Sequence, residues 1–320
     1  GAADTVQKLN LGNERRIYAG GETAYWLATD PVLALQKYQR VTGAGLGEGG
    51  QIDFVNLGAV EILLGGGNDT FTIVETHAGT TLLETGAGDD HIDIRSIAGA
   101  TTVNTGTGAD VVRVGSQAGL ANELGTVDLI AATLSIDGGA DADTVYVDDT
   151  GDTTANTGYL TRNQLAGLGM DGNNTAGGIF YTGLEALDIR LGSAGDHFNI
   201  GSTHTGTTLV LGNNGDDIFL VGTLDPAQNG LLDGIDGKLT LDGGAGVDEL
   251  NVRDNADTSN NKGFLDNVSP TSTRITGLDM GDVGDNGTDV DAARGIDFGA
   301  FEALTLELGG GNDNLAVLGT

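Results

Sequence analysis

Eight loops of the chain combine glycine with aspartate in a way that suits a hard metal ion. Each loop ends on an aspartate that directly precedes an alternating apolar pattern: Asp69, Asp90, Asp110, Asp143, Asp196, Asp216, Asp248 and Asp313. A glycine-rich turn exposes backbone carbonyl oxygens, because no side chain shields them. Calcium takes roughly six to eight oxygen ligands, and stacked loops can supply carbonyls and carboxylates together. The loops therefore predict the rungs of a calcium ladder.

The glycines recur at fixed places before these aspartates. Four residues earlier stand Gly65, Gly86, Gly106, Gly139, Gly192, Gly212, Gly244 and Gly309. A second glycine follows two residues later in the first three loops, as Gly67, Gly88 and Gly108. Asp141 and Ala194 replace the second glycine elsewhere, which we expect to weaken those sites. A competing interpretation is that glycine and aspartate only reverse the chain, since both favour turns without metal.

Apolar residues at alternate positions predict the strands that hold the loops. Two and four residues after the aspartate stand pairs such as Phe71 and Ile73, or Ile218 and Leu220 after Asp216. A further apolar residue precedes each first glycine by three positions. One buried face per strand follows from this alternation. Each unit is thus expected to run strand, Gly–Asp loop, strand.

The spacing of the loops predicts the fold. Asp69, Asp90 and Asp110 follow one another at 21 and 20 residues, which fits two short strands and two tight loops. We therefore expect an all-β, right-handed parallel β-solenoid (β-helix or β-roll) with loop and short-helix excursions. Wider spacings indicate the excursions. Because an ion needs two neighbouring loops, the short coils at 69–110 and 196–216 are the best expected sites.

A longer repeat overlies the short one and suggests the domain organisation. We expect one continuous solenoid over 1–320, with super-repeats at 51–177 and 178–294 and the start of a third at 295–320. Residues 1–50 differ, because they hold Trp26 and five basic residues, and they predict a packed excursion or a contact surface. Within them 29–40 has a helix-start pattern. The pattern is cut at both ends, which suggests a longer array or head-to-tail contacts.

Composition narrows the classes of function. With 46 acidic and 14 basic residues, the net charge of −32 argues against nucleic acid and anionic membranes as partners. No cysteine is present, so zinc-thiolate, disulfide and Cys-nucleophile chemistry are excluded. No apolar run is long enough for membrane insertion. The acid clusters at 148–152 and 253–257 are expected to be solvated loops, with ion binding as the alternative.

The loops also resemble a known repeat family. "TGAGDDHID", "TGTGADVVR" and "LGGGNDTFT" are similar to the glycine-rich nonapeptide of hemolysin-type (RTX) calcium-binding proteins. The resemblance implies a secreted protein with calcium held by the eight aspartates and by carbonyls of the preceding loops, including those of Gly65, Gly67, Gly86, Gly88, Gly106 and Gly108. The chain departs from the family in spacing, because its motif returns at 20 residues or more rather than at nine.

Together these features predict an extracellular calcium-binding structural element that self-associates end to end: a filament, surface layer, matrix or adhesin stalk. A secreted carbohydrate-active β-helix enzyme, a ligand-binding adhesin module and an ice-binding threonine array are the alternatives. A cleft that gathers acids and bases would favour the enzyme. The four histidines do not cluster in sequence with other ligands, and we expect no catalytic residue.

Overall fold

The computed structural model describes residues 14–18, 24–30, 38–42, 51–54, 57–121, 124–173, 177–223, 229–281 and 294–319. These residues form β-strands, turns and one 3-10 segment, Met170–Asn173. The chain divides into two compact units. Unit 1 contains residues 1–148 and 169–184, and unit 2 contains residues 149–168 and 185–320.

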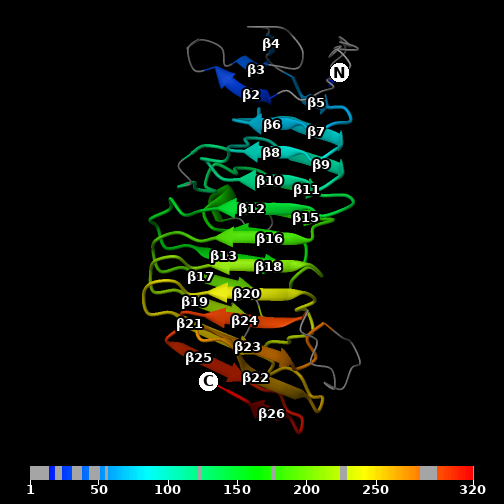
Figure 1. The fold of residues 1–320 in the computed structure, drawn as a ribbon. Coiled ribbons are helices and arrows are strands. Elements are labelled where there is room, and N and C mark those ends of the chain that lie inside the picture. The colour runs from blue at the N-terminus through cyan, green and yellow to red at the C-terminus, as the bar shows by residue number, and fades with distance from the viewer. Residues whose placement is uncertain are drawn as a thin grey trace. The chain divides into compact units, whose positions relative to one another are not determined.

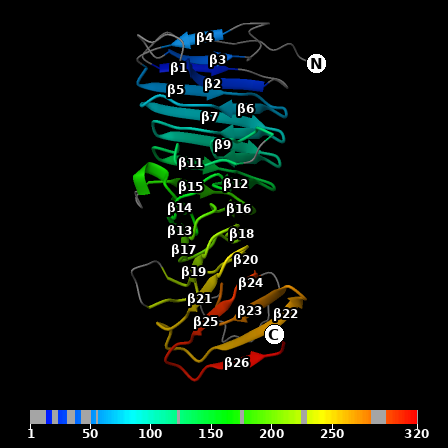
Figure 2. The same cartoon turned by 90° about the vertical axis from the view of Figure 1, so that its left-hand side faces the viewer.

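Unit 1 holds two mostly parallel sheets, whose neighbouring strands can be followed in Figures 1 and 2. The first has the order β1 (Glu14–Tyr18), β5 (Ala59–Leu63), β7 (Thr80–Ala87), β9 (Thr101–Thr107), β11 (Leu134–Asp137) and β15 (Ile179–Thr182). The second has the order β12 (Thr144–Asp148), β10 (Val111–Val114), β8 (His91–Ile94), β6 (Thr70–Ile73), β2 (Ala24–Asp30), β3 (Tyr38–Thr42) and β4 (Gln51–Phe54). From β5 to β12 successive strands alternate between the sheets, so each circuit of the chain adds one strand to both.

Unit 2 repeats this plan. One sheet has the order β14 (Gln164–Gly167), β13 (Thr157–Thr161), β17 (His197–Ile200), β19 (Ile218–Val221), β21 (Glu249–Arg253) and β25 (Ala303–Glu307). The other has the order β26 (Asn314–Val317), β22 (Lys262–Ser269), β23 (Ser272–Gly277), β24 (Gly295–Gly299), β20 (Lys238–Asp242), β18 (Thr207–Leu211) and β16 (Ala186–Arg190). The stack from β16 to β24 is clear in Figure 1.

The core of each unit consists of apolar side chains stacked in register along the sheets. In unit 1, Phe71 lies opposite Ile92, and Ile92 lies opposite Val112. In unit 2, Phe198 lies opposite Phe219 with their ring centroids 6.2 Å apart. Because each strand buries one face on its neighbours, every circuit depends on the circuits above and below it.

Antiparallel hairpins interrupt the parallel pairing of the sheets at several places. β13 pairs with β14, and β22 pairs with β23, each by antiparallel hydrogen bonds. β3 is antiparallel to both β2 and β4. These hairpins account for part of the extra residues in the wider spacings between the aspartates.

The all-β class and the parallel stacking of strands are confirmed. The right-handed solenoid itself stays a prediction, because the two sheets do not close on each other in the described residues. The helix over 29–40 is wrong at both of its ends, since Thr29 and Asp30 end β2 and Tyr38 begins β3. Residues 31–37, and the side chains of 1–39 that would form the expected contact surface, lie outside the described part of the chain.

Candidate metal centre

The aspartates that close the Gly–Asp loops of unit 1 form a hydrogen-bonded row. The backbone N–H of Asp69 donates to Oδ1 of Asp90 at 2.8 Å, and the N–H of Asp90 donates to Oδ1 of Asp110 at 2.7 Å. The N–H of Asp110 in turn donates to Oδ1 of Asp143 at 2.9 Å. All four residues are buried, with at most 2% of their surface exposed. One sequence position thus supplies both a donor and an acceptor to the row.

A second row runs through unit 2. Asn156 donates its N–H to Asp196, Asp196 donates to Asp217, and Asp217 donates to Asp248, each to Oδ1 at 2.7–2.8 Å. The N–H of Asp248 donates to Oε2 of Glu302 at 2.7 Å, so a glutamate continues the row. Figure 1 locates these loops just before β17, β19, β21 and β25.

In both units, the residue before a row aspartate takes part in hydrogen bonds that run in the opposite direction, because its N–H donates to a side chain of the preceding loop. The N–H of Asp89 donates to Oδ1 of Asn68 at 2.9 Å, and the N–H of Ala109 donates to Oδ1 of Asp89 at 3.0 Å. In unit 2 the N–H of Val247 donates to Oδ1 of Asp216 at 2.9 Å. Adjacent loops are therefore joined by two side chains, one from each loop.

The glycines allow the loops to lie this close. Gly86, Gly88, Gly106 and Gly108 have φ between 101° and 124°, in the left-handed region that disfavours a side chain. A Cβ on Gly106 would lie 2.0 Å from the carbonyl oxygen of Gly86. Gly67 also has a positive φ of 144°, whereas Gly65 is absent from the left-handed set among the described residues. Only glycine fits where one loop's carbonyl faces the next loop's Cα.

The structure corrects the sequence alignment at Asp216. Asp216 is exposed, and the buried row position belongs to the next residue, Asp217. The strand register agrees, because Phe219 rather than Ile218 pairs with Phe198. Ile218 is 36% exposed, so the predicted inward position of Ile218 is wrong. Two adjacent aspartates make both alignments possible, and Gly212, four residues before Asp216, favours the wrong one.

The loop conformation explains the true register. Four residues before Asp217 stands Asn213 with a φ of 68°, where Gly86 and Gly106 stand in unit 1. Gly215, two residues later, has a φ of 122°. Asparagine tolerates the left-handed region better than most residues, so Asn213 serves as a glycine substitute. Asp141, with a φ of 86°, fills the second-glycine position in the loop that ends at Asp143.

The remaining predicted aspartates differ in their surroundings. Asp143 and Asp248 stack directly against the preceding aspartates despite the longer spacing, so neighbouring loops also occur outside the short coils that were expected to be the best sites. Asp196 is in the row, but its Oδ2 accepts the N–H of Gly192, and that loop lacks left-handed residues. Asp313 leaves the row of Asp248, because its Oδ1 accepts the N–H of Asn261 and β26 pairs with β22.

Several row carboxylates retain a buried oxygen that no donor reaches. Oδ2 of Asp90, of Asp217 and of Asp248 is buried without a hydrogen-bond partner. Burial, together with the charges of Asp196 and Asp248, raises the pKa of Asp217 to about 7. Burial also raises the pKa of Asp248. A buried charged oxygen with no partner costs free energy, and a bound cation removes that cost.

These residues fit calcium in the chemistry of their donors. The unpartnered Oδ2 atoms and the carbonyl-rich glycine turns are oxygen ligands, as calcium prefers. Within the described residues, no three His, Cys, Asp or Glu side chains converge into a metal site of their own. An ion in the row would thus take one or two carboxylates and complete its shell with carbonyls or water.

The two acid clusters were predicted as solvated loops, which is wrong for three of their five aspartates. Asp149, Asp152 and Asp254 are 1%, 6% and 1% exposed. The sequence signal that could have revealed this is the shared spacing in "DDTGDTTAN" and "RDNADTSNN", which both continue to an asparagine before a strand. Asn156 and Asn261, like Glu302, were not predicted as part of any site.

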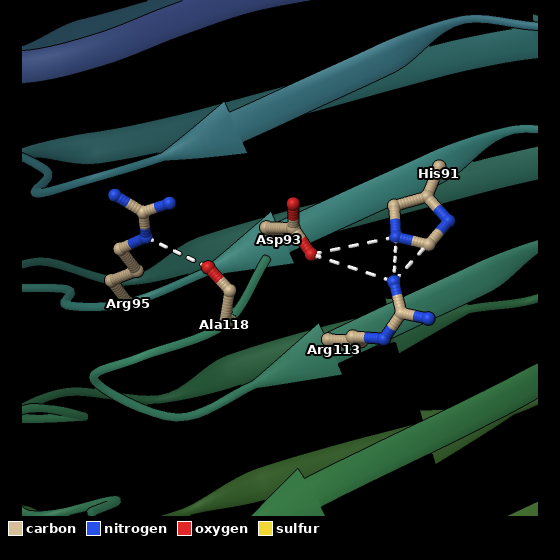
Figure 3. Close-up of polar contacts among 5 residues, drawn as sticks. All are labelled: His91, Asp93, Arg95, Arg113 and Ala118. Atoms are coloured by element: carbon tan, nitrogen blue, oxygen red, sulfur yellow. Dashed lines mark hydrogen bonds and ion pairs between the residues drawn. The ribbon is translucent and has the colours of Figure 1, made fainter. Parts of the chain in front are cut away.

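A second polar group lies on β8 and β10 (Figure 3). Oδ1 of Asp93 lies 3.5 Å from Nε2 of His91 and 3.9 Å from Nη1 of Arg113, and Arg113 also contacts the His91 ring. Burial raises the pKa of Asp93 and lowers the pKa of His91. Nε of Arg95 donates to the carbonyl of Ala118 at 2.8 Å, which holds the following loop across the strand.

An open hollow of about 450 Å³ lies elsewhere in unit 1. Its lining comes from β5, β7 and the region of β9: Ala59, Val60, Glu61, Thr80, Thr81, Leu82, Ala100 and Thr102. Glu61 is the one ionisable residue of that lining, and His91, Asp93 and Arg113 are not part of it. The hollow therefore lends no support to the enzyme alternative.

Neither a protein-family model nor a curated protein matches the chain. In the described part of the chain, no helix has the length and apolar character needed to cross a membrane.

Proposed function

We propose that the chain is a calcium-binding structural solenoid that works outside the cell as an extended assembly element, such as a filament, surface-layer or stalk component. The observation that carries this proposal is the row of buried aspartates. Asp90, Asp217 and Asp248 each use one carboxylate oxygen to accept the N–H of the preceding loop, and each keeps the other oxygen buried and unpartnered. Calcium ions along the row would neutralise these carboxylates and link successive circuits.

The charge of the molecule supports the same proposal. A net charge of −32 opposes compaction unless cations offset it. The row concentrates several of these charges in buried positions one strand apart, about 4.8 Å. Calcium is abundant outside cells, so a chain that needs calcium to fold would fold after export and stay unfolded inside the cell.

The end-to-end assembly in the proposal rests on the outermost strands of unit 2. Leu304 in β25 is 37% exposed, Val317 in β26 is 58% exposed, and the adjacent Leu318 is 63% exposed. Apolar side chains on sheet edges are a common contact for a further strand. A second copy of the chain is the occupant that the repeat pattern suggests.

A thermal melt followed by far-UV circular dichroism tests the calcium row. We expect the melting temperature and the β-signal to fall after EDTA treatment and to recover with calcium but not with magnesium. Asp217→Asn should remove a large part of the calcium-dependent gain, since a neutral amide is a poorer ligand.

Asp216→Asn is the matched control, because it makes the same chemical change at the adjacent aspartate, which is exposed. It should leave most of the calcium-dependent gain intact. A wild-type melt that is the same in EDTA and in calcium would mean that the Gly–Asp loops are turns only.

A further inference from the structure

Unit 2 contains a second kind of carboxylate cluster, away from the Gly–Asp loops. Asp254, Asp257 and Asn261 lie between β21 and β22. Oδ1 of Asp254 accepts the N–H of Leu232 at 3.2 Å, and Oδ1 of Asp257 accepts the N–H of Ser259 at 2.8 Å. The Asn261 amide reaches both aspartates, because its Nδ2 donates to Oδ2 of Asp254 at 3.3 Å and contacts Oδ2 of Asp257. One amide thus bridges two carboxylates.

The same arrangement occurs earlier in unit 2. The Asp152 N–H donates to the carbonyl of Asp149 at 2.9 Å, as the Asp257 N–H donates to that of Asp254 at 3.0 Å. Nδ2 of Asn156 contacts Oδ2 of Asp152, and the Asn156 N–H donates to Asp196. The repetition shows that the cluster is a built feature of the long repeat. In this copy the asparagine is only half-buried.

The copy at 254–261 has the more deeply buried asparagine, and its carboxylates have no basic side chain as a partner. Asp254 is 1% exposed and Asn261 is 2% exposed. No Lys or Arg in the described residues forms an ion pair with Asp254 or Asp257, whose donors come from backbone N–H groups and neighbouring neutral side chains. Burial, together with the charges of Asp257 and Asp233, raises the pKa of Asp254 to about 7.

An independent observation points to a ligand here. Oδ1 of Asn261 is buried and has no hydrogen-bond partner. An unpartnered buried acceptor costs about 1–3 kcal/mol, so a buried asparagine normally finds a donor for it. The two ends of an amide have the same shape, and a half-turn exchanges them. After such a half-turn, the amide oxygen of Asn261 would face the carboxylates of Asp254 and Asp257. That arrangement is favourable only if a cation lies between the three groups.

We propose that Asp254, Asp257 and Asn261 form a side-chain site for a hard divalent cation, calcium, that is separate from the aspartate row. The two carboxylates and the amide oxygen are its ligands, with carbonyls or water completing the shell. The ion replaces the amide as the link between the carboxylates. It would thereby fasten the segment that connects β21 to the β22–β23 hairpin. The copy at 149–156, whose asparagine is only half-buried, would hold an ion more weakly.

Hydrogen exchange of the full chain, read by mass spectrometry during a calcium titration, tests the site. We expect calcium to protect residues 254–261. Asp257→Asn should abolish this protection while the row loops 213–217 and 244–248 still respond. Asp217→Asn, a row variant, should leave the protection of 254–261 intact. If Asp217→Asn removes it, the response is transmitted from the row and the proposal is wrong.

Asn261→Asp gives a second test that does not depend on weakening the fold. With an ion present, the added carboxylate should lower the calcium concentration for half-maximal protection by about tenfold, or about 1.4 kcal/mol. Without an ion, it only adds charge beside two carboxylates and loosens 254–261 at every calcium concentration, which would overturn the site. Asn156→Asp is the matched control and should have a smaller effect. A row that fails to respond while 254–261 is protected would contradict the proposed function alone.

Discussion

At the scale of single residues, a buried row aspartate can both accept and donate a hydrogen bond between loops. Oδ1 of Asp217 receives the N–H of the preceding loop, and the N–H of Asp217 itself donates to the following loop. This explains why the position repeats even where the surrounding glycines do not. Asp196 shows the limit, since its second oxygen is satisfied by Gly192 within its own loop. In the proposed calcium row, hydrogen bonding and metal binding would therefore use different oxygens of one carboxylate.

Asp217 gives the calcium-free protein a defined pH dependence. Its pKa is raised to about 7 by burial, whereas an aspartate in an unfolded chain has a pKa of about 3.9. Between these values the folded chain holds a proton that the unfolded chain has lost, so stability falls as the pH rises through this window. In EDTA, melting should thus occur at a higher temperature at about pH 5 than at about pH 8.

The control for this prediction is the same series on Asp217→Asn, which removes the titrating group. Its melting temperature should change less over that pH range than that of the wild type. A wild-type protein that becomes more stable as the pH rises in EDTA would show that other groups dominate.

At the scale of elements, the sequence predicted the strands well because every circuit repeats the same burial pattern. Phe71, Ile92 and Val112 are inward as expected. The failures have local causes. The doubled aspartate at 216 and 217 left the register ambiguous by one residue, which moves a whole strand face. The aspartates of the clusters at 148–152 and 253–257 looked solvated because the loops that contact them lie far away in the sequence, as Ser193 does for Asp152 and Leu232 for Asp254.

Strand β19 provides the test of that register. Phe219 is fully buried, between Phe198 on one side and Leu250 on the other, whereas Ile218 is 36% exposed. Phe219→Ala should cost about 3–5 kcal/mol in the free energy of unfolding, as for other buried phenylalanines. Ile218→Ala should cost well under half as much. Urea unfolding measures both, and similar losses for the two variants would restore the original register.

At the scale of the whole molecule, charge sets the conditions for association. Two copies that each carry a net charge of −32 repel each other, and bound calcium reduces that charge. Exposed apolar residues on β25 and β26 can then meet a second copy. Assembly should therefore require calcium, even at a salt concentration that screens much of the repulsion.

Sedimentation velocity tests this association. In millimolar calcium the wild type should form species larger than a monomer, and in EDTA it should not. Val317→Glu should sediment as a monomer in calcium, while Leu129→Glu, at a residue that is 50% exposed in unit 1, should associate like the wild type. A wild type that stays monomeric at high concentration in calcium would contradict the assembly.

The link between Asp110 and Asp143 has an evolutionary consequence. These residues are 33 positions apart, yet their hydrogen bond of 2.9 Å matches the 2.7 Å bond that joins Asp90 to Asp110 across 20 positions. The contact between neighbouring loops therefore does not depend on the number of residues that separate them in the sequence. Insertions and deletions can thus accumulate on the outside without disturbing the axis. Among natural variants, length differences should fall between β10 and β11 or between β19 and β20, where new surfaces can be tried while the ladder is inherited unchanged.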